Sequence, residues 1–443
     1  MHTHLSPDYA HNPQAQEAAQ LLRQCVHCGF CTATCPTYQL LGDELDGPRG
    51  RIYQIKQVLE GQAPTRATQQ HLDRCLTCRN CESTCPSGMQ YGALLDIGRQ
   101  LVDAQVARPW HQRAVRWLLW RGLASPLFAP LLQVGQWLRP VLPAVLRAKV
   151  PPRQRRAASA SQTRAGVHAA VSPPPALQRV VLLQGCVQPA MAPNINAATE
   201  RVLAACGVQT VLAQHAGCCG ALAWHLNQAD PALAQAKANI DAWWPLLFPT
   251  DGTAAAQAIV VNASGCTVMV KDYGHLLAHD PAYAERARQV SSLCQDLSEL
   301  LPHLLPMLQQ VLPGAVRQRR STDKSTGGKA LPRLVFHPPC TLQHGQQLRG
   351  GVESALGSLG FSVRLAEREA HLCCGSAGTY SVLQPALSGQ LRQRKLAGLA
   401  AQAGEVIVSA NVGCITHLQA GTTTPVRHWV EVVDAVLHGD TTD

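Results

Sequence analysis

Cysteine residues recur in this chain at spacings that suit metal clusters. Residues Cys25 to Pro36 read C-V-H-C-G-F-C-T-A-T-C-P, and Cys75 to Pro86 read C-L-T-C-R-N-C-E-S-T-C-P. Each copy has the spacing C-x2-C-x2-C-x3-C-P, whose thiolates bind cubane [4Fe–4S] clusters. A thiolate at every third residue lets one tight loop reach three irons of one cube. Zinc also takes four cysteines, but usually as two C-x2-C pairs, so a triplet plus Cys-Pro fits it poorly.

The fourth cysteine of each copy is predicted to bind the cluster of the other copy, as in two-cluster ferredoxins. The first cluster would be bound by Cys25, Cys28, Cys31 and Cys85. The second cluster would be bound by Cys75, Cys78, Cys81 and Cys35. Two cubane [4Fe–4S] clusters held in this way predict a protein that transfers electrons.

Eight further cysteines form a second system of two sets. One set is Cys186, Cys218, Cys219 and Cys266; the other is Cys340, Cys373, Cys374 and Cys414. Adjacent cysteines cannot easily place both thiolates on one ion, but they can bridge different irons of an open cluster. The glycine after each pair allows a close approach of the backbone. A further Fe–S cluster, a zinc site and a structure without metal all remain open for these sets.

The pattern along the chain predicts an α+β multidomain fold. Residues 1–105 are expected to form a mostly α-helical ferredoxin-like module, followed at 106–176 by a basic, Trp- and Leu-rich strap and a flexible linker. Two pseudo-symmetric α/β repeats are expected at 177–312 and 333–443, with a linker at 313–332. Each repeat reads strand–Cys, helix, strand–Cys-Cys-Gly, helix, strand–Cys, which favours parallel α/β units. The cysteines follow the carboxyl ends of strands, where open sheets gather ligands.

The positive charge of the chain lies in one segment. The 443 residues carry a net charge of +10, yet no acidic residue occurs between Asp103 and Glu200, where twelve basic residues lie. For the strap from Arg108 to Val150, two interpretations stay open. Its Trp and Leu residues could pack against the repeats while its Arg residues face water, or the strap could contact a membrane peripherally, with Arg toward anionic lipid. Nucleic-acid binding is not expected, because no base-reading module accompanies the charge.

The location expected is the cytoplasm, with peripheral contact at the inner face of the cytoplasmic membrane as an extension. No export signal is evident, and clustered cysteines without one indicate metal in a reducing compartment. The most apolar candidate for a membrane span, Gly122 to Leu138, is short and is interrupted by Pro126 and Pro130.

Several other residues are given structural roles. Cys206 and Cys294 are expected to be buried thiols without a metal. His337 and His344, which flank Cys340, are also expected to be structural. The segment G-P-R-G-R at 47–51 is expected to be a turn whose two arginines lie near a cluster.

The Cys-Cys-Gly sets resemble the cysteine-rich (CCG) domain of the heterodisulfide-reductase B subunit. That resemblance implies a motif C…C-C-G…C-x2-C that binds a non-cubane [4Fe–4S] cluster. Met269 stands three residues after Cys266, and His417 stands three after Cys414, where the motif has its last cysteine. The donors available are therefore four thiolates, or three thiolates with His417.

The residues between the cysteines resemble those of a more specific family. The phrase L-R-Q-C-V-H-C-G-F-C-T-A-T-C-P-T-Y-Q-L-L-G-D-E-L-D-G-P-R-G-R, the segment His71 to Arg99 and the closing A-N-V-G-C-I-T-H-L-Q are similar to the iron–sulfur subunits of bacterial glycolate oxidase (glycolate dehydrogenase). This resemblance implies that partner subunits oxidise glycolate to glyoxylate at FAD. The present chain would relay the electrons toward a membrane quinone or another acceptor.

The sequence agrees with a relay role, because it contains no G-x-G-x-x-G after a strand and no Walker loop. FAD is therefore expected on the partner subunits only, and no catalytic acid or base is assigned here. One alternative is an equivalent relay subunit of a glycerol-3-phosphate or lactate dehydrogenase, or of a heterodisulfide-reductase-like complex. Another is that the Cys-Cys-Gly half itself reduces a disulfide or a quinone.

Overall fold

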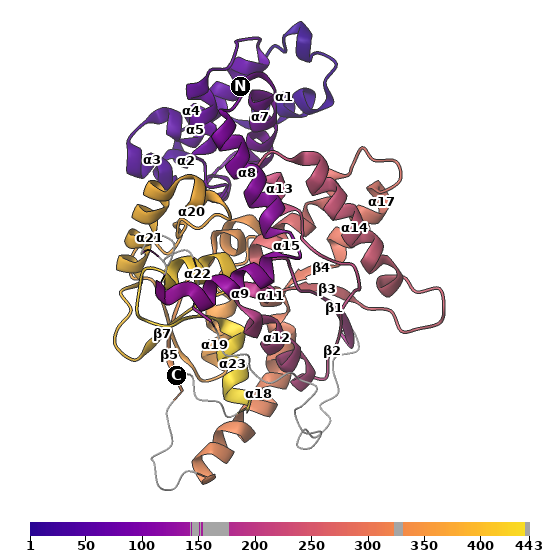
Figure 1. Cartoon of the computed structure of the whole chain (residues 1–443), viewed down its shortest axis with the longest axis vertical. Helices are drawn as coiled ribbons and strands as arrows, with labels where there is room; N and C mark the ends of the chain where they lie inside the picture. The colour runs from indigo at the N-terminus through magenta and orange to yellow at the C-terminus, as the bar shows by residue number, and fades with distance from the viewer. Residues whose placement is uncertain (142, 144–149, 151, 154–176, 323–330, 439–443) are drawn as a thin grey trace.

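The computed structural model describes all residues except 142, 144–149, 151, 154–176, 323–330 and 439–443. An N-terminal helical module lies at one end of the molecule and two α/β units lie side by side beneath it (Figure 1). The α+β multidomain class expected from the sequence is therefore what the structure shows. No helix in the described ranges is long and apolar enough to cross a membrane.

The N-terminal module is built from four longer helices around a small core. They are α1 (Pro13–Gln24), α4 (Pro48–Leu59), α5 (Arg66–Asp73) and α7 (Tyr91–Gln105), with the one-turn helices α2 (Phe30–Ala33), α3 (Pro36–Leu41) and α6 (Asn80–Ser83) after cysteines. Leu22, Ile55 and Leu94 are buried at their centre. Each cysteine motif runs from a loop into a one-turn helix, so the longer helices hold the two cysteine loops in place.

The expectation of a turn at residues 47–51 was wrong. Gly47 precedes the first residue of α4, and Pro48 occupies its first turn. Proline suits this position, because its fixed φ matches a helix and the amide hydrogen that it lacks would have no partner there. Gly50 is required by close packing, since a Cβ at this position would lie 2.1 Å from the carbonyl oxygen of Glu44.

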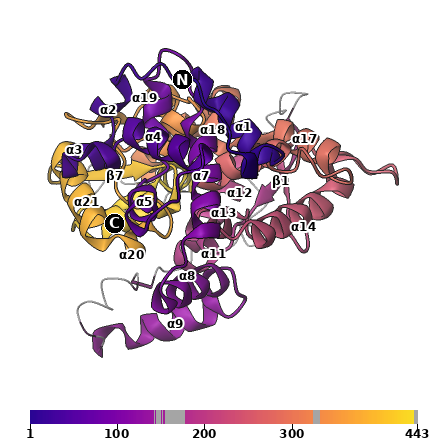
Figure 2. The same ribbon diagram turned by 90° about the horizontal axis from the view of Figure 1, so that it is seen from above.

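The strap forms a helical hairpin of α8 (Trp110–Leu123) and α9 (Phe128–Leu138). Figure 2 shows this hairpin standing off from the rest of the molecule. Helix α8 touches α13 (Ala221–Trp224), and α9 touches α11 (Gln188–Met191). The flexible linker expected up to residue 176 lies almost wholly outside the described residues.

Each repeat contains one parallel four-stranded sheet. The first has the order β2-β1-β3-β4 and the second β6-β5-β7-β8. The strands are β1 (Arg179–Leu183), β2 (Gln209–Val211), β3 (Ala258–Val261), β4 (Cys294–Asp296), β5 (Arg333–Phe336), β6 (Ser362–Leu365), β7 (Glu405–Ser409) and β8 (Val426–His428). In register, Val180 lies beside Ala258, and Leu334 beside Val406. The sequence pattern predicts three of these strands in each repeat but not the fourth, β4 or β8.

Helices cover both sheets. In the first repeat they include α12 (Pro193–Ala205), α14 (Ala229–Leu247), α15 (Ser264–Lys271), α16 (Tyr273–Leu276), α17 (Ala284–Leu293) and α18 (Leu297–Thr322). In the second they are α19 (Gly351–Ser358), α20 (Tyr380–Leu383), α21 (Pro385–Leu399), α22 (Val412–Gln419) and α23 (Trp429–His438), with a π-turn at Thr341–Gly345. Helix α18 runs on into the segment that was expected to be a linker.

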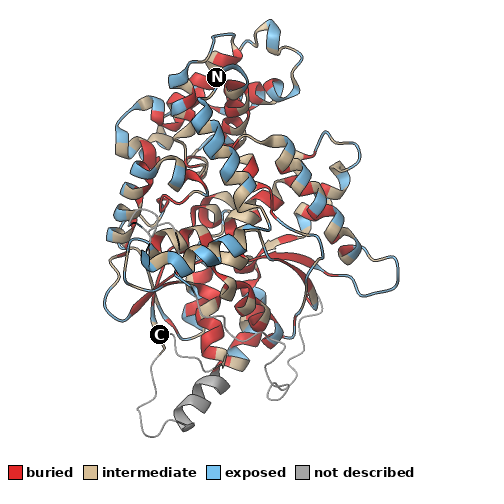
Figure 3. Ribbon diagram, in the orientation of Figure 1, coloured by how far each residue is buried: buried red, intermediate tan, exposed pale blue. Residues whose placement is uncertain are grey.

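The two repeats exchange their last helices. Helix α23 packs on α12 of the first repeat, and α18 packs on α19 of the second. Residues from both sheets and these helices share one core, which includes Val202, Leu301 and Val433. Figure 3 shows the buried residues gathered on the strands and on the helices between the two sheets. The reciprocal packing relates the repeats by the pseudo-two-fold arrangement that their sequence similarity suggests.

An ion pair crosses this shared core. The Nε of Arg201 on α12 donates to Oδ1 of Asp434 on α23 at 2.9 Å, and both side chains are almost fully buried. Burial alone would raise the pKa of Asp434, but the hydrogen bonds from Arg201 and His438 lower it. The carboxylate therefore stays ionised inside the interface between the repeats.

We expect Asp434→Asn to destabilise the protein by about 3 kcal/mol or more, because it leaves a buried guanidinium facing a neutral amide. Thermal unfolding of the anaerobic protein should show a midpoint several degrees lower. Stability from a carboxyl with a lowered pKa is present above its unfolded value and lost as the pH falls through the folded one. The gap between variant and wild type should therefore narrow in acid. Glu285→Gln, which removes an exposed partner of Arg288, should leave the midpoint unchanged.

Candidate metal centres

A hollow in the N-terminal module is lined by cysteines from both motifs. It has a volume of about 420 Å³, and its wall includes the set Cys25, Cys28, Cys31 and Cys85. Burial raises the pKa of the Cys31 thiol; a hydrogen bond with Thr32 lowers it, the charges of the other three thiols raise it, and the net pKa is about 11. The four sulfur atoms are thus close enough to sense one another's charge. Cys28 is exposed, so this hollow reaches the surface.

The module contains a second hollow, of about 300 Å³. Its wall includes the set Cys35, Cys75, Cys78 and Cys81. In both hollows the triplet of one motif meets the fourth cysteine of the other. The structure therefore brings together each set of four that was named from the spacing. Soft thiolates in sets of four are the donors that Fe–S clusters take, so these residues fit the clusters that the spacing predicts.

Arg51 places a buried positive charge at the second hollow. Its guanidinium donates to the carbonyl oxygen of His71 at 2.8 Å and to Oγ1 of Thr37 at 3.2 Å. Burial alone would lower the pKa of Arg51, but the nearby Cys75 and other anionic groups raise it. The arginine stays charged. Its position at the wall of this hollow agrees with the prediction that the arginines of residues 47–51 lie near a cluster. A positive charge beside a cluster favours its reduced state.

The four cysteines of the first repeat also converge. Cys186 follows β1, the pair Cys218 and Cys219 precedes α13, and Cys266 lies in α15 after β3. Hydrogen bonds link Cys186 to Cys218, Cys218 to Cys219, and Cys219 to Cys266. The bonds from Cys186 and Cys219 lower the pKa of the Cys218 thiol.

Two uncharged side chains hydrogen-bond to the backbone of this first set. Tyr273 donates its hydroxyl to the carbonyl oxygen of Cys219 at 2.8 Å, and the amide of Asn239 donates to that of Cys218 at 2.9 Å. These bonds orient the backbone that carries the cysteine pair.

The four cysteines of the second repeat converge in the same way. Cys340 lies 3.8 Å from Cys373, sulfur to sulfur, and hydrogen bonds continue from Cys373 to Cys374 and from Cys374 to Cys414. All four are buried. Each Cys-Cys pair needs the glycine that follows it: a Cβ on Gly375, which has φ +89°, would lie 2.7 Å from a backbone oxygen.

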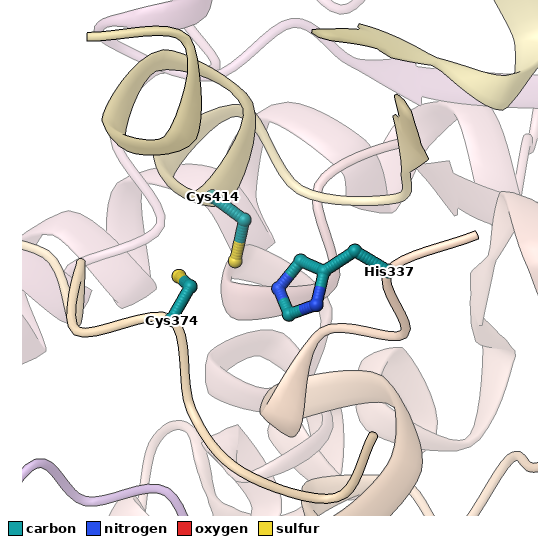
Figure 4. Close-up of side chains that lie close together, drawn as sticks. All are labelled: His337, Cys374 and Cys414. Carbon is teal, nitrogen blue, oxygen red and sulfur yellow. The ribbon is translucent and has the colours of Figure 1, made fainter. Parts of the chain in front are cut away.

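His337, not His417, lies with the cysteines of the second repeat. One ring nitrogen of His337 and the sulfurs of Cys374 and Cys414 all lie within 4.8 Å of one another (Figure 4). Nε2 of His417 instead lies 3.2 Å from Oγ of Ser388. Burial lowers the pKa of His337 well below its usual range, which keeps the imidazole neutral. The sequence offered one signal for His337, since it directly follows β5 at the carboxyl edge of the sheet.

The other residues for which a structural role was predicted are buried or hydrogen-bonded within the protein. Cys206 is fully buried in the core shared by the repeats, and Cys294 is buried in β4. His344 lies between the two parts of the chain, with its Nδ1 2.8 Å from Oγ of Ser83 and its Nε2 2.8 Å from the carbonyl oxygen of His371.

The second hollow and the second-repeat site are neighbours. Cys78 packs in one apolar cluster with Cys340, Cys373 and Tyr380. Burial raises the pKa of Cys78, and the charge of Cys340 raises it further. Tyr380 also donates its hydroxyl to the carbonyl oxygen of Arg74 at 3.1 Å. This contact joins the N-terminal module to the second repeat through their cysteines.

The first repeat meets the module through polar contacts. Nη2 of Arg79 lies 2.9 Å from Oδ2 of Asp272, and Nε1 of Trp224 donates to Asp96 at 2.8 Å.

Comparison with known proteins agrees with this layout. The family described as "4Fe-4S dicluster domain" matches residues 21–89, and the "Cysteine-rich domain" family matches residues 180–271 and 334–419. The Escherichia coli (strain K12) "Glycolate oxidase iron-sulfur subunit" is 50% identical over 99% of both chains. The chain belongs to the family of glycolate oxidase iron–sulfur subunits. This assignment gives it an iron–sulfur electron-transfer role.

More distant relatives share the same parts. The Bacillus subtilis (strain 168) "Probable glycolate oxidase iron-sulfur subunit" is 29% identical over 90% of this chain and 89% of its own. "Lactate utilization protein A" of an Exiguobacterium species is 23% identical over 58% of this chain and 98% of its own. The glycolate oxidase family members thus match nearly the whole chain, whereas the lactate utilization protein matches only part of it.

The crossed ligand sets can be tested by pairing variants. We expect Cys85→Ser to lose the same electron paramagnetic resonance (EPR) signal as Cys28→Ser, with about four irons lost per chain. Cys35→Ser should lose the same signal as Cys78→Ser. Cys206→Ser, which alters a buried thiol outside the four sets, should keep all signals. If Cys85→Ser matched Cys78→Ser, the ligand sets would be uncrossed.

Proposed function

We propose that this chain relays electrons within a glycolate oxidase complex. Partner subunits that carry FAD oxidise glycolate to glyoxylate, and the electrons pass through this chain toward a quinone-type acceptor. The observation that carries the proposal is the contact of Cys78 with Cys340 and Cys373, which links the module to a Cys-Cys-Gly site. Because electron transfer slows steeply with distance, packed ligand sets favour a continuous path.

The ligand sets named from the spacing are the proposed carriers. Two [4Fe–4S] clusters are assigned to the two hollows, and a further Fe–S cluster or zinc to the Cys-Cys-Gly sites. When bound, such clusters supply reversible one-electron transfer. The chain's part is to hold the thiolates, exclude water from the buried sets and place charges such as Arg51 beside them.

The first hollow is the proposed point of entry. It reaches the surface at Cys28, and the apolar side chains of Val26 and Phe30 beside it are 67% and 61% exposed. Exposed apolar side chains around a redox site suit contact with a partner protein. A flavoprotein subunit docked here would place its FAD near the first cluster.

The alternative substrate with a specific observation behind it is lactate. The similarity to "Lactate utilization protein A" supports it, but covers only 58% of the chain. The relative that matches 99% of the chain favours glycolate.

Peripheral membrane contact is proposed for the helical hairpin α8–α9. Trp110, Trp117 and Trp137 are 79%, 58% and 80% exposed, so these side chains do not pack against the repeats. Figure 3 shows no buried residue along either helix. Exposed Trp and Leu next to basic residues are typical of interfacial helices. The proposed site is the inner face of the cytoplasmic membrane.

Not all arginines of the hairpin region face outward. Arg108 and Arg116 pair with Asp73, with N–O distances of 2.5 and 3.0 Å, and all three side chains are largely buried. These two arginines attach the strap to the N-terminal module. Arg113 and Arg121 are exposed and are the ones that could meet anionic lipid.

The substrate can be tested on the anaerobically co-purified complex. We expect glycolate to reduce the clusters of this chain, so that low-temperature EPR signals of reduced Fe–S centres appear. Lactate and glycerol-3-phosphate, added to parallel samples at equal concentration, should reduce them far less. Clusters that dithionite reduces but glycolate does not would contradict the proposal.

Vesicle binding tests the membrane contact. The change Arg113→Gln with Arg121→Gln should weaken binding to vesicles that contain phosphatidylglycerol by about 2 kcal/mol, or roughly 30-fold. Binding should weaken because the variant has less basic charge near the lipid surface. Co-sedimentation with the vesicles measures the binding. The matched control, Arg288→Gln with Arg368→Gln, removes two exposed arginines elsewhere and should bind as wild type does. Equal binding by both double variants would exclude an electrostatic role for the hairpin.

A further inference from the structure

We propose that His337 is a ligand of the metal centre in the second Cys-Cys-Gly site, which thereby differs from the first site in its donors. The inference rests on the proposal that this site binds metal. It concerns a residue that the spacing of the cysteines does not indicate.

The imidazole of His337 is buried without a hydrogen-bond partner among the described residues. His337 is 1% exposed, and among the described residues neither ring nitrogen has a hydrogen-bond partner. Each unpaired buried polar group costs about 1–3 kcal/mol. The backbone of His337 is held in place, because its amide donates to Val408 at 2.8 Å and its carbonyl accepts from Ser409 at 2.9 Å. The backbone bonds therefore fix the position of an imidazole whose unpaired burial destabilises the fold.

The ring of His337 faces two cysteine sulfurs. Figure 4 shows the ring pointing toward the sulfurs of Cys374 and Cys414, which reach it from different segments. The three donor atoms lie within 4.8 Å of one another, the arrangement of ligands around a single ion. A neutral imidazole is a good ligand for both iron and zinc. Metal binding would satisfy a ring nitrogen that no protein group satisfies.

The first repeat has a leucine at the position that corresponds to His337. Aligning R-V-V-L-L-Q-G-C at 179–186 with R-L-V-F-H-P-P-C at 333–340 places Leu183 opposite His337. Leu183 is 2% exposed and packs in an apolar cluster with Cys219 and Trp243. An ordinary core side chain occupies the position in one repeat, so the fold itself does not require a histidine there.

A further difference accompanies the histidine. A Cβ on Gly220 would meet the carbonyl oxygen of Ala232 in α14, and a Cβ on Gly375 would meet that of Ser388 in α21. Ala232 and Ser388 therefore occupy corresponding positions in the two repeats. Seven residues onward, Asn239 of the first repeat corresponds to Lys395 of the second. Lys395 is 3% exposed, and burial lowers its pKa while the charges of Cys374 and Cys373 oppose that shift. The second site thus combines an uncharged donor with a nearby amine.

These differences indicate the direction of electron flow. A neutral histidine donor favours a higher potential of an Fe–S centre than an anionic thiolate does, as in Rieske clusters. The second site, which also contacts Cys78, is then the more easily reduced of the two Cys-Cys-Gly sites. Electrons arriving through the second hollow would collect there.

The experiment uses the full chain, purified anaerobically with its metal and labelled with ¹⁵N-histidine. We expect pulsed EPR to detect a ¹⁵N coupling to one reduced centre in the wild type. His337→Leu, which copies the first repeat, should abolish that coupling and lower the midpoint potential of the centre if it remains. If the metal is zinc, X-ray absorption should show a short Zn–N distance that His337→Leu removes.

Two variants serve as controls. His428→Leu removes another imidazole that is 1% exposed and is the last residue of β8 in the same sheet, and this variant should keep the coupling. His337→Cys should restore metal content through a thiolate but show no ¹⁵N coupling. A coupling that persists in His337→Leu, or a wild-type centre without any, would overturn the assignment.

The wider proposal has its own readout. Cys374→Ser and Cys414→Ser should lower the metal content of the chain if the second site binds metal. Unchanged metal in both variants would refute metal binding at this site, and the ligand assignment with it. Lost metal without a histidine coupling would refute only the role of His337.

Discussion

The constraint on which this structure depends is the gathering of like-charged sulfurs. Sixteen of the eighteen cysteines lie in four sets, and most of them are buried. Thiolates crowded into a site of low dielectric repel one another, which is why burial and neighbouring thiols raise the pKa of Cys31 and Cys78. Metal neutralises this charge, so binding and folding are coupled. The fold must hold the cysteine loops together against the repulsion between thiolates, which bound metal would offset.

The protein uses two ways of converging cysteines. In the N-terminal module, short spacings place three thiolates in one loop, and helices such as α4 and α7 bring the fourth from the other motif. In the repeats only the Cys-Cys pair is local in sequence, and Cys340, Cys374 and Cys414 come from three separate segments that follow strands of one sheet. The parallel order β6-β5-β7-β8 is what makes those ends adjacent. Cys78 then joins the two systems across the boundary between module and repeat.

These two ways explain what the sequence could and could not predict. The ferredoxin-like sets were readable because their geometry is local, and the central strands β1, β3, β5 and β7 because they are continuous apolar runs. Strands β4 and β8 were missed, since C-Q-D and V-R-H are three residues long and not apolar throughout. His337 was given a structural role because a lone histidine carries no periodicity. Only the sheet, which sets it opposite Cys374 and Cys414, distinguishes it from His417.

The basic side chains near the cysteine sets become more buried from the first hollow to the second Cys-Cys-Gly site. At the first hollow, Arg49 is half-exposed and already paired with Glu44 at 2.6 Å. At the second, Arg51 and Arg74 share one carboxylate, that of Asp46, so a net positive charge lies inside the protein. Lys395 and a neutral histidine follow in the second Cys-Cys-Gly site, whereas the first has Asn239 and Tyr273. Because positive surroundings stabilise a reduced cluster, this order favours electrons moving inward from the exposed Cys28 toward His337. The first Cys-Cys-Gly site would then lie beside the proposed path.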